Sequence, residues 1–228
     1  MYTVKTGIKP LDKKLNGGLC GGSLTVITGR PAMGKSSFVF QIAGNIAECG
    51  KRVLLFSLEM DEPLVRKRMS KQGYGSSENN VIVYDEPNQS VEYITQKATS
   101  AEKVDAIIVD YIHLMRGIKH KLISGKQKVE EIVSGLKHLA EKMNVPVIVV
   151  SQLSRNVDGV TDIFPLVDSV RKAGFREQDT DIIIFLYLEL FYNEPENYLM
   201  ILGENKYGEI GIIPVRWNKE KGIFADRK

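Results

Sequence analysis

Cysteine is scarce in this sequence, and the two cysteines present form no metal-binding pattern. Cys20 and Cys49 make no CxxC pair and have no histidine at ligand spacing. We therefore expect no structural zinc and a reducing, cytoplasmic compartment.

Long apolar runs are also missing. The longest, residues 182–188, falls far short of the roughly 20 residues that a membrane helix needs. The N-terminal sequence MYTVKTGIKP has no apolar stretch of the kind found in signal peptides. Both absences predict a soluble protein without a membrane partner.

The sequence has no large excess of charge of either sign. Its 31 lysines and arginines and 28 aspartates and glutamates leave a net charge of +3, too small to indicate a nucleic-acid partner by itself. The 228 residues, 43% of them hydrophobic, suit one large domain with a proper core. No repeat or low-complexity linker divides the chain, and Thr6-Gly7 already indicates the beginning of the fold. We therefore expect a single domain over residues 1–228, without an N-terminal accessory domain.

Short apolar runs alternate with helical patterns as far as residue 152. Runs rich in Val, Ile and Leu predict strands at residues 23–29, 52–58, 80–85, 104–115 and 145–152. Helices are expected between them, at residues 35–50, 61–72, 89–103 and 128–143. Three more strands, 181–190, 197–203 and 209–218, follow without intervening helices. The pattern predicts an α/β fold: a mostly parallel central sheet flanked by helices, with a C-terminal antiparallel extension.

Two stretches, 116–127 and 153–180, show little regular pattern. Long irregular connections inside a compact α/β domain are usually functional or disordered. Both follow expected parallel strands, so they leave the same edge of the sheet, where ligands of open α/β sheets gather.

The stretch GRPAMGKS, residues 29–36, matches the phosphate-loop pattern G-x-x-x-x-G-K-[ST] in full. It lies between an expected strand and an expected helix, which is the context that this motif requires, and a chance glycine-rich turn is the alternative. Backbone amides of such a loop cradle phosphates, aided by the helix N-terminus. Lys35 would neutralise the phosphates, and the Ser36 hydroxyl would bind Mg²⁺. The residues expected to hold the nucleotide are Gly29, Arg30, Pro31, Ala32, Met33, Gly34, Lys35, Ser36 and Ser37.

Three polar residues at the ends of other strands complete this candidate site. Asp110 ends the apolar run AIIVD, where a carboxylate would hold the Mg²⁺ shell beside Ser36. Glu59 ends the second strand and is the candidate general base for water. Gln152 ends the fifth strand, where its amide could contact the γ-phosphate and report its loss to the next loop. The alternatives are ordinary strand-end residues that cap turns or lie at the surface.

Six motifs occur in order over nearly the whole chain: TGIKPLD, GRPAMGKS, LLFSLEM, IIVDYIHLM, VPVIVVSQLSR and EQDTD. Together they resemble the RecA-type motor domain of DnaB-family replicative helicases. FSLEM and SQLSR favour that family over recombinases and general P-loop kinases. The resemblance implies a RecA-like P-loop fold, a ring that is a hexamer, ATP and Mg²⁺ bound between subunits, single-stranded DNA in the channel, and a primase or helicase loader as partner.

The resemblance also implies that the loops after the fourth and fifth strands contact DNA. The first loop carries the cations Arg116, Lys119, Lys121 and Lys126. The second contains DSVRKAGFREQD, which is similar to the family's DNA-gripping loop at Arg171, Lys172 and Gly174. Such cations would bind phosphates independently of sequence, and ordinary solvated loop charge is the alternative.

GENKYGEIG, residues 203–211, departs from the family pattern. The family has a lysine and, two residues later, an arginine that reaches the neighbouring subunit's γ-phosphate. Here Glu204 and Lys206 occupy these positions, so we expect a hairpin whose Lys206 is a candidate trans finger and whose Glu204 points away or pairs with a cation. Lysine lacks the planar two-pronged contact of arginine, which predicts slow hydrolysis or a finger that acts differently.

Three function classes follow from these residues. The first is an ATP hydrolase of the DnaB type that translocates on single-stranded DNA and unwinds duplex. The second is a RecA- or RadA-like DNA-binding ATPase that remodels DNA or protein complexes without unwinding. The third is a ring component that binds nucleotide without catalysis, and the intact Lys35, Glu59 and Asp110 argue against it.

Overall fold

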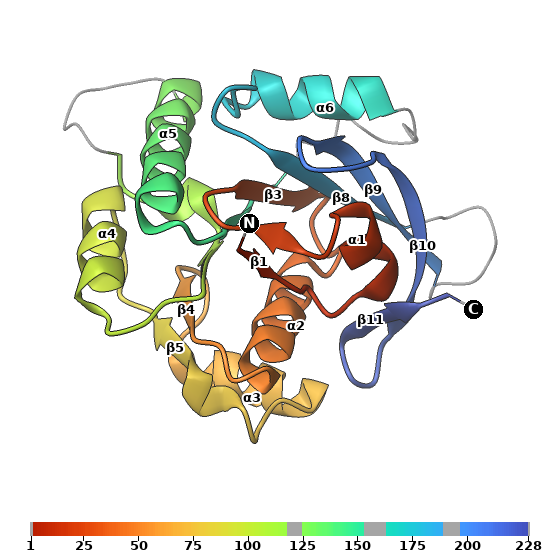
Figure 1. Cartoon of the computed structure of the whole chain (residues 1–228), viewed down its shortest axis with the longest axis horizontal. Helices are drawn as coiled ribbons and strands as arrows, with labels where there is room; N and C mark the ends of the chain where they lie inside the picture. Colours follow the sequence, from red (N-terminus) through yellow and green to blue (C-terminus); the bar gives the residue numbers. More distant parts are fainter. Residues whose placement is uncertain (1, 118–124, 153–162, 189–196, 228) are drawn as a thin grey trace.

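The computed structural model describes residues 2–117, 125–152, 163–188 and 197–227. In this part of the chain one nine-stranded sheet has the order β11-β10-β9-β8-β3-β7-β6-β4-β5, and β1 pairs with β2 in a separate small sheet (Figure 1). The parallel strands are β3 (Leu24–Gly29), β4 (Val53–Ser57), β5 (Val81–Tyr84), β6 (Ala106–Asp110), β7 (Val147–Val150) and β8 (Ile182–Leu188). The antiparallel extension contains β9 (Asn197–Asn205), β10 (Gly211–Asn218) and β11 (Ile223–Asp226). The predicted fold class is confirmed.

Helices cover both faces of the sheet. The described helices are α1 (Lys9–Lys14), α2 (Lys35–Glu48), α3 (Glu62–Gln72), α4 (Val91–Ser100), α5 (Gly125–Met143) and α6 (Ile163–Lys172), with short 3-10 turns η1 (Glu78–Asn80) and η2 (Ile112–Leu114). Local sequence explains two helix starts: Asp61 accepts a hydrogen bond from the Leu64 amide, and Ser90 accepts one from the Tyr93 amide. The remaining short strands are β1 (Thr3–Val4) and β2 (Leu19–Cys20).

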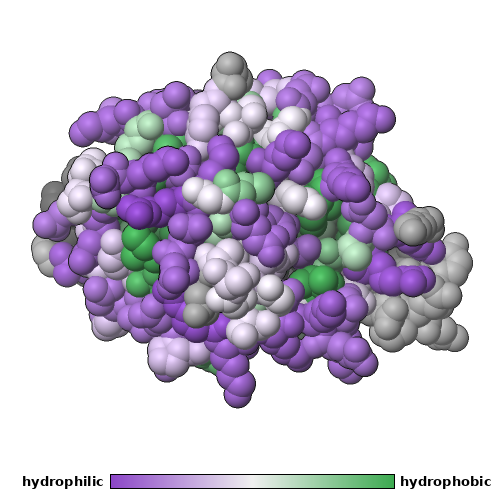
Figure 2. All heavy atoms as spheres, turned by 60° about the horizontal axis from the view of Figure 1, so that its bottom comes forward, coloured by the Kyte–Doolittle hydropathy of each residue, from purple (hydrophilic) through white to green (hydrophobic). Residues whose placement is uncertain are grey.

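Two hydrophobic cores lie on opposite faces of the sheet, because successive strand residues point to opposite sides. In β4, Leu55 belongs to the core that also contains residues of α1, α2 and α3, whereas Leu54 and Phe56 belong to the core that contains residues of α4, α5 and α6. Both faces are apolar, as a parallel sheet covered by helices requires. On the face shown in Figure 2, hydrophobic side chains form small areas separated by hydrophilic ones. Among the described residues, none of the helices combines the length and the apolar character needed to cross a membrane.

Two predictions about secondary structure were wrong, and four short elements were not predicted. The strand expected over 104–115 ends at Asp110, and a 3-10 turn follows in which Ile112 and Met115 stay buried without pairing in the sheet. A short apolar run cannot distinguish such a buried turn from a strand. The stretch 153–180, expected to be irregular, contains α6, whose Leu166 and Val170 are buried. The small elements β1, β2, α1 and β11 were not predicted, since each is too short to show a period.

Candidate nucleotide and DNA sites

The phosphate-loop sequence connects β3 to α2, as predicted. Two of its residues, Gly29 and Gly34, have backbone conformations that favour glycine. Gly29 has φ 153°, and a Cβ atom there would lie 2.6 Å from the Leu186 carbonyl oxygen. Gly34, the residue before α2, has φ 78° in the left-handed region. A side chain at either position would strain or displace the loop. The loop therefore presents its backbone directly to the space in front of α2.

This space is a cavity of about 510 Å³ at the carboxyl ends of the parallel strands. Its lining residues are Pro31, Ala32, Gly34, Lys35, Ser36, Ser37, Glu59, Met60, Arg68, Asp110, Tyr111, Val150, Gln152 and Trp217. The sheet order explains the gathering: β6 lies between β4 and β7, so residues after all three strands meet at one edge. Lys35, Ser36, Glu59, Asp110 and Gln152, distant in sequence, are thereby brought together. Gly29, Arg30 and Met33 belong to the loop but do not line the cavity in the described structure.

Lys35 begins α2 and folds back over its own loop. Its ammonium donates hydrogen bonds to the carbonyl oxygens of Gly29, at 3.1 Å, and Arg30, at 2.7 Å. Burial lowers the pKa of Lys35, while the nearby carboxylates of Asp110 and Glu59 oppose this shift. The ammonium is therefore a cation held at the cavity by weak, neutral acceptors, which an anionic ligand could replace.

Asp110 is almost completely buried at the floor of the cavity. Neither of its carboxylate oxygens has a hydrogen-bond partner within the described part of the chain. Burial raises the pKa of Asp110 to about 6; the nearby Ser36 hydroxyl opposes the shift and the Glu59 charge adds to it. A buried carboxylate without partners costs free energy unless a cation is supplied. Asp110 and the Ser36 hydroxyl offer hard oxygen ligands of the kind that Mg²⁺ prefers.

Glu59 and Gln152 lie at the opening of the cavity. Both are exposed, and each is the second residue after its strand, β4 for Glu59 and β7 for Gln152, close to the strand ends where the sequence placed them. Their side chains therefore remain accessible to solvent and to a ligand.

Two residues that line the cavity were missed by sequence reasoning. Arg68 lies on α3, and its charge acts to lower the pKa of Asp110. Trp217 lies on β10, where its ring packs against Phe224 with ring centroids 4.7 Å apart. No motif singles out Arg68, whereas Trp217, the single tryptophan of the chain, could have been noted for that reason.

Residues 206–210 connect β9 to β10, which pair antiparallel, so the hairpin predicted for 203–211 is confirmed. The Lys206 ammonium donates to the Glu177 carbonyl oxygen, at 2.7 Å, and to Asp181 Oδ1, at 3.3 Å. Asp181 also accepts a hydrogen bond from the amide of Leu24, the first residue of β3. The phosphate loop follows the other end of β3. Within one chain, Lys206 therefore lies by the amino ends of the parallel strands and Lys35 by their carboxyl ends, and we call these two sides the opposite edges of the sheet.

Glu204 forms an ion pair with Arg171. Pairing with a cation is one of the two outcomes expected for Glu204 from the sequence. Burial raises the pKa of Glu204, and the Arg171 charge opposes that shift. Arg171 also donates to the Phe175 carbonyl oxygen at 2.7 Å. The guanidinium predicted to grip DNA is thus engaged within the protein, where it ties the end of α6 to β9.

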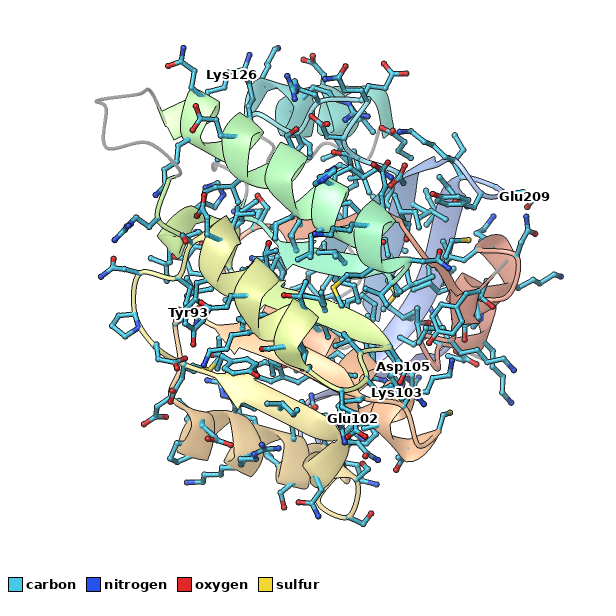
Figure 3. The ribbon with its side chains drawn as sticks, turned by 60° about the vertical axis from the view of Figure 1, so that its left-hand side comes forward. Tyr93, Glu102, Lys103, Asp105, Lys126 and Glu209 are labelled. Atoms are coloured by element: carbon cyan, nitrogen blue, oxygen red, sulfur yellow. The ribbon has the colours of Figure 1, made fainter. Side chains whose placement is uncertain are left out.

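The other cations proposed for DNA contact have different surroundings. Arg116 is exposed after η2, and Lys126 is exposed at the start of α5 (Figure 3), 3.8 Å from Glu130. Lys172 is exposed at the end of α6, 2.5 Å from Asp168. Gly174 has φ 108°, and a Cβ atom there would lie 2.7 Å from the Lys126 carbonyl oxygen.

The start of α5 and the end of α6 therefore lie side by side, which brings the backbone of Lys126 close to the Arg171–Gly174 turn. The predicted Lys119 and Lys121 lie outside the described residues.

Comparison with known proteins decides the family. The profile of the DnaB-like helicase C-terminal domain matches residues 3–75 and 65–226, nearly the whole chain. The chain belongs to this family. Among curated relatives, the replicative DNA helicase DnaB of Geobacillus stearothermophilus is 29% identical over 256 residues, which cover 98% of this chain and 56% of that protein. The chain thus spans little more than half the length of that relative.

Solved structures agree with the DnaB-like assignment. A separately solved ATPase domain superposes with a TM-score of 0.88 at 27% identity, covering 100% of this chain and 92% of that one. A DnaB-like replicative helicase, described with its interactions with primase, gives a TM-score of 0.86 at 28% identity and covers 100% of this chain and 64% of that one. The RecA-like fold and the membership of the DnaB-like family that the motifs predicted are confirmed.

Proposed function

We propose that this chain is the ATP-driven motor domain of a ring-shaped replicative DNA helicase, which hydrolyses ATP at subunit interfaces to translocate on single-stranded DNA and unwind duplex. The observation that carries the proposal is the gathering of Lys35, Ser36, Glu59, Asp110 and Gln152 around one cavity in a chain of the DnaB-like family. The family match favours this over a RecA- or RadA-like ATPase that does not unwind.

In this proposal the phosphate loop binds ATP through its backbone amides and Lys35. Ser36 and Asp110 hold Mg²⁺, directly or through water, because the Asp110 oxygens are buried without another partner. When bound, the ion neutralises charge on the transferred phosphoryl group. Glu59, exposed at the opening, orients and deprotonates the attacking water. Gln152, next to the loop that follows β7, contacts the γ-phosphate and responds to its loss.

Lys206 acts on a different nucleotide in this proposal. Because it lies at the sheet edge opposite Lys35, its own chain's phosphate site is out of its reach, and its target is the nucleotide of a neighbouring copy. A closed ring, proposed to be a hexamer, brings these two edges together at every interface. We also propose residues 1–228 as one motor domain, single-stranded DNA as the track, and a primase or loader as a further partner.

The proposal is tested by ATP turnover with and without single-stranded DNA, measured beside the light-scattering mass in a non-hydrolysable ATP analogue. We expect ring assembly and turnover that DNA stimulates, together with strand displacement on a forked duplex. Turnover without strand displacement would instead support the RecA- or RadA-like alternative. A protein that stays monomeric and hydrolyses ATP at the same rate with and without single-stranded DNA would contradict the motor proposal.

Replacing Lys206 with arginine tests the trans finger. A guanidinium makes two parallel contacts where an ammonium makes a point contact, so Lys206→Arg should hydrolyse ATP at least as fast as the natural protein. The measurement is kcat in the assembled ring. An unchanged kcat there, with no loss in Lys206→Gln, would mean that Lys206 is only part of a hairpin turn.

The DNA contacts are tested by replacing, one at a time, two neighbouring basic residues of α6 with glutamine. Lys172→Gln should reduce the slope of log affinity for single-stranded DNA against log salt by about 0.7, the contribution of one phosphate contact. Arg171→Gln should also lower the free energy of unfolding by about 1 kcal/mol, because Glu204 loses its partner. Salt titrations of binding and urea unfolding measure the two effects. An unchanged slope in both variants would exclude this turn from the DNA interface.

A further inference from the structure

A second cleft, of about 630 Å³, lies at the sheet edge opposite the phosphate loop. It is lined by Arg176, Glu177, Gln178 and Lys206. The first three belong to the turn between α6 and β8, and Lys206 comes from the β9–β10 hairpin. Two cations and one carboxylate therefore face the same space from segments that are distant in sequence.

Arg176 has no part in the cavity around Lys35. Its side chain is 43% exposed. Its Nε and Nη2 atoms lie 2.7 and 2.6 Å from one oxygen of Asp179, which is itself buried. These contacts orient the planar guanidinium but use only part of its five N–H donors. Arg176 is thus a held cation that can still donate into the cleft.

Lys206 is also held by hydrogen bonds within the protein. Asp181, which is buried, accepts from Lys206 through Oδ1 and from Lys137 through Oδ2 at 2.8 Å. With the Glu177 carbonyl oxygen as a second acceptor, the Lys206 ammonium has one of its three donors left for a ligand. A lysine fixed in this manner supplies charge but no planar fork.

We infer that Arg176 and Lys206 together form the site for the terminal phosphates of a nucleotide bound by a second copy of this chain, with Arg176 supplying the planar guanidinium that position 206 lacks. This inference rests on the proposed function. The cleft contains no phosphate loop of its own, since that loop lies at the other end of β3, so the site is completed only by a neighbouring copy. A guanidinium pairs with phosphate oxygens through two parallel hydrogen bonds, which strengthen as charge develops during transfer.

The first test compares Arg176→Gln with Arg176→Lys and with Arg227→Gln, an exposed arginine that lines neither cleft. We expect Arg176→Gln to lower kcat by about 10- to 100-fold, because the finger role is shared between two cations, with KM for ATP nearly unchanged. Arg176→Lys should recover part of the loss, and Arg227→Gln should match the natural protein. Millimolar guanidinium ion should raise the rate of Arg176→Ala but not that of Lys35→Ala.

The second test mixes subunits whose defects lie on opposite edges. Lys35→Ala removes the phosphate-binding lysine and leaves Arg176 and Lys206 intact, whereas the double variant Arg176→Gln, Lys206→Gln does the reverse. Each alone should be nearly inactive. A mixed ring pairs an intact phosphate loop with intact cations at some interfaces, so turnover should reappear on mixing.

The outcomes separate this inference from the proposed function. If the natural protein shows DNA-stimulated turnover but Arg176→Gln keeps its full kcat, the inference is wrong and the motor function stands. Loss of turnover that neither guanidinium ion nor subunit mixing restores also overturns the inference, since Arg176 would then serve only the structure of its turn. A natural protein without turnover overturns the proposed function and this inference with it.

Discussion

Glu59→Gln should lower ATP turnover by about 10²- to 10⁴-fold, the usual contribution of a general base. Glutamine keeps the shape of glutamate but cannot take the proton of the attacking water. ATP binding should be retained or tightened, because the variant removes a negative charge from the cavity that receives the phosphates. Single-turnover hydrolysis and nucleotide affinity, measured on the same ring, separate the two effects.

The matched control for this prediction is Glu62→Gln, three residues further along the chain and outside the cavity. Glu62 pairs with Arg66 on α3, so its loss should cost a few tenths of a kcal/mol of stability and leave turnover unchanged. Equal turnover in Glu59→Gln and the natural protein would remove Glu59 as the base. Measurable turnover that Glu59→Gln abolishes would also exclude a ring component that binds nucleotide without catalysis.

Lys35→Ala should weaken ATP binding by about 10- to 100-fold, the value of one or two lost hydrogen bonds to a charged ligand. Turnover should fall further, by about 10³-fold, because the ammonium also stabilises the charge that develops on the phosphates. The Gly29 and Arg30 carbonyl oxygens that Lys35 contacts are exchangeable acceptors, so the loop should keep its fold. Nucleotide titration and steady-state kinetics measure both losses.

Lys71→Ala is the control, because Lys71 is an exposed lysine at the end of α3 and lines neither cleft. It should bind and hydrolyse ATP as the natural protein does. Normal ATP affinity in Lys35→Ala would contradict the phosphate-loop assignment. Reduced thermal stability in Lys35→Ala without nucleotide would mean that Lys35 has a structural role in the loop.

The sequence by itself determined the parallel sheet, the phosphate loop and the set Lys35, Ser36, Glu59, Asp110 and Gln152. Each lies in an apolar strand, within two residues of its end, or at a helix start, and the strand order brings such positions together at one end of the parallel strands. Local pattern was sufficient there because parallel strands share a direction, so their carboxyl ends must meet.

Only the tertiary structure decided the rest. Lys206 lies at the edge of the sheet opposite the phosphate loop because β9 pairs antiparallel with β8, so the end of β9 lies beside the start of β8. The sequence does not specify which strand β9 pairs with. Arg171 is engaged by Glu204, 33 residues away, and Trp217 reaches the nucleotide cavity from β10. Arg176 and Lys206 face one cleft for the same reason: two turns distant in sequence lie together only once the strands have paired. Such contacts depend on long-range packing, which leaves no periodic or motif signal in the chain.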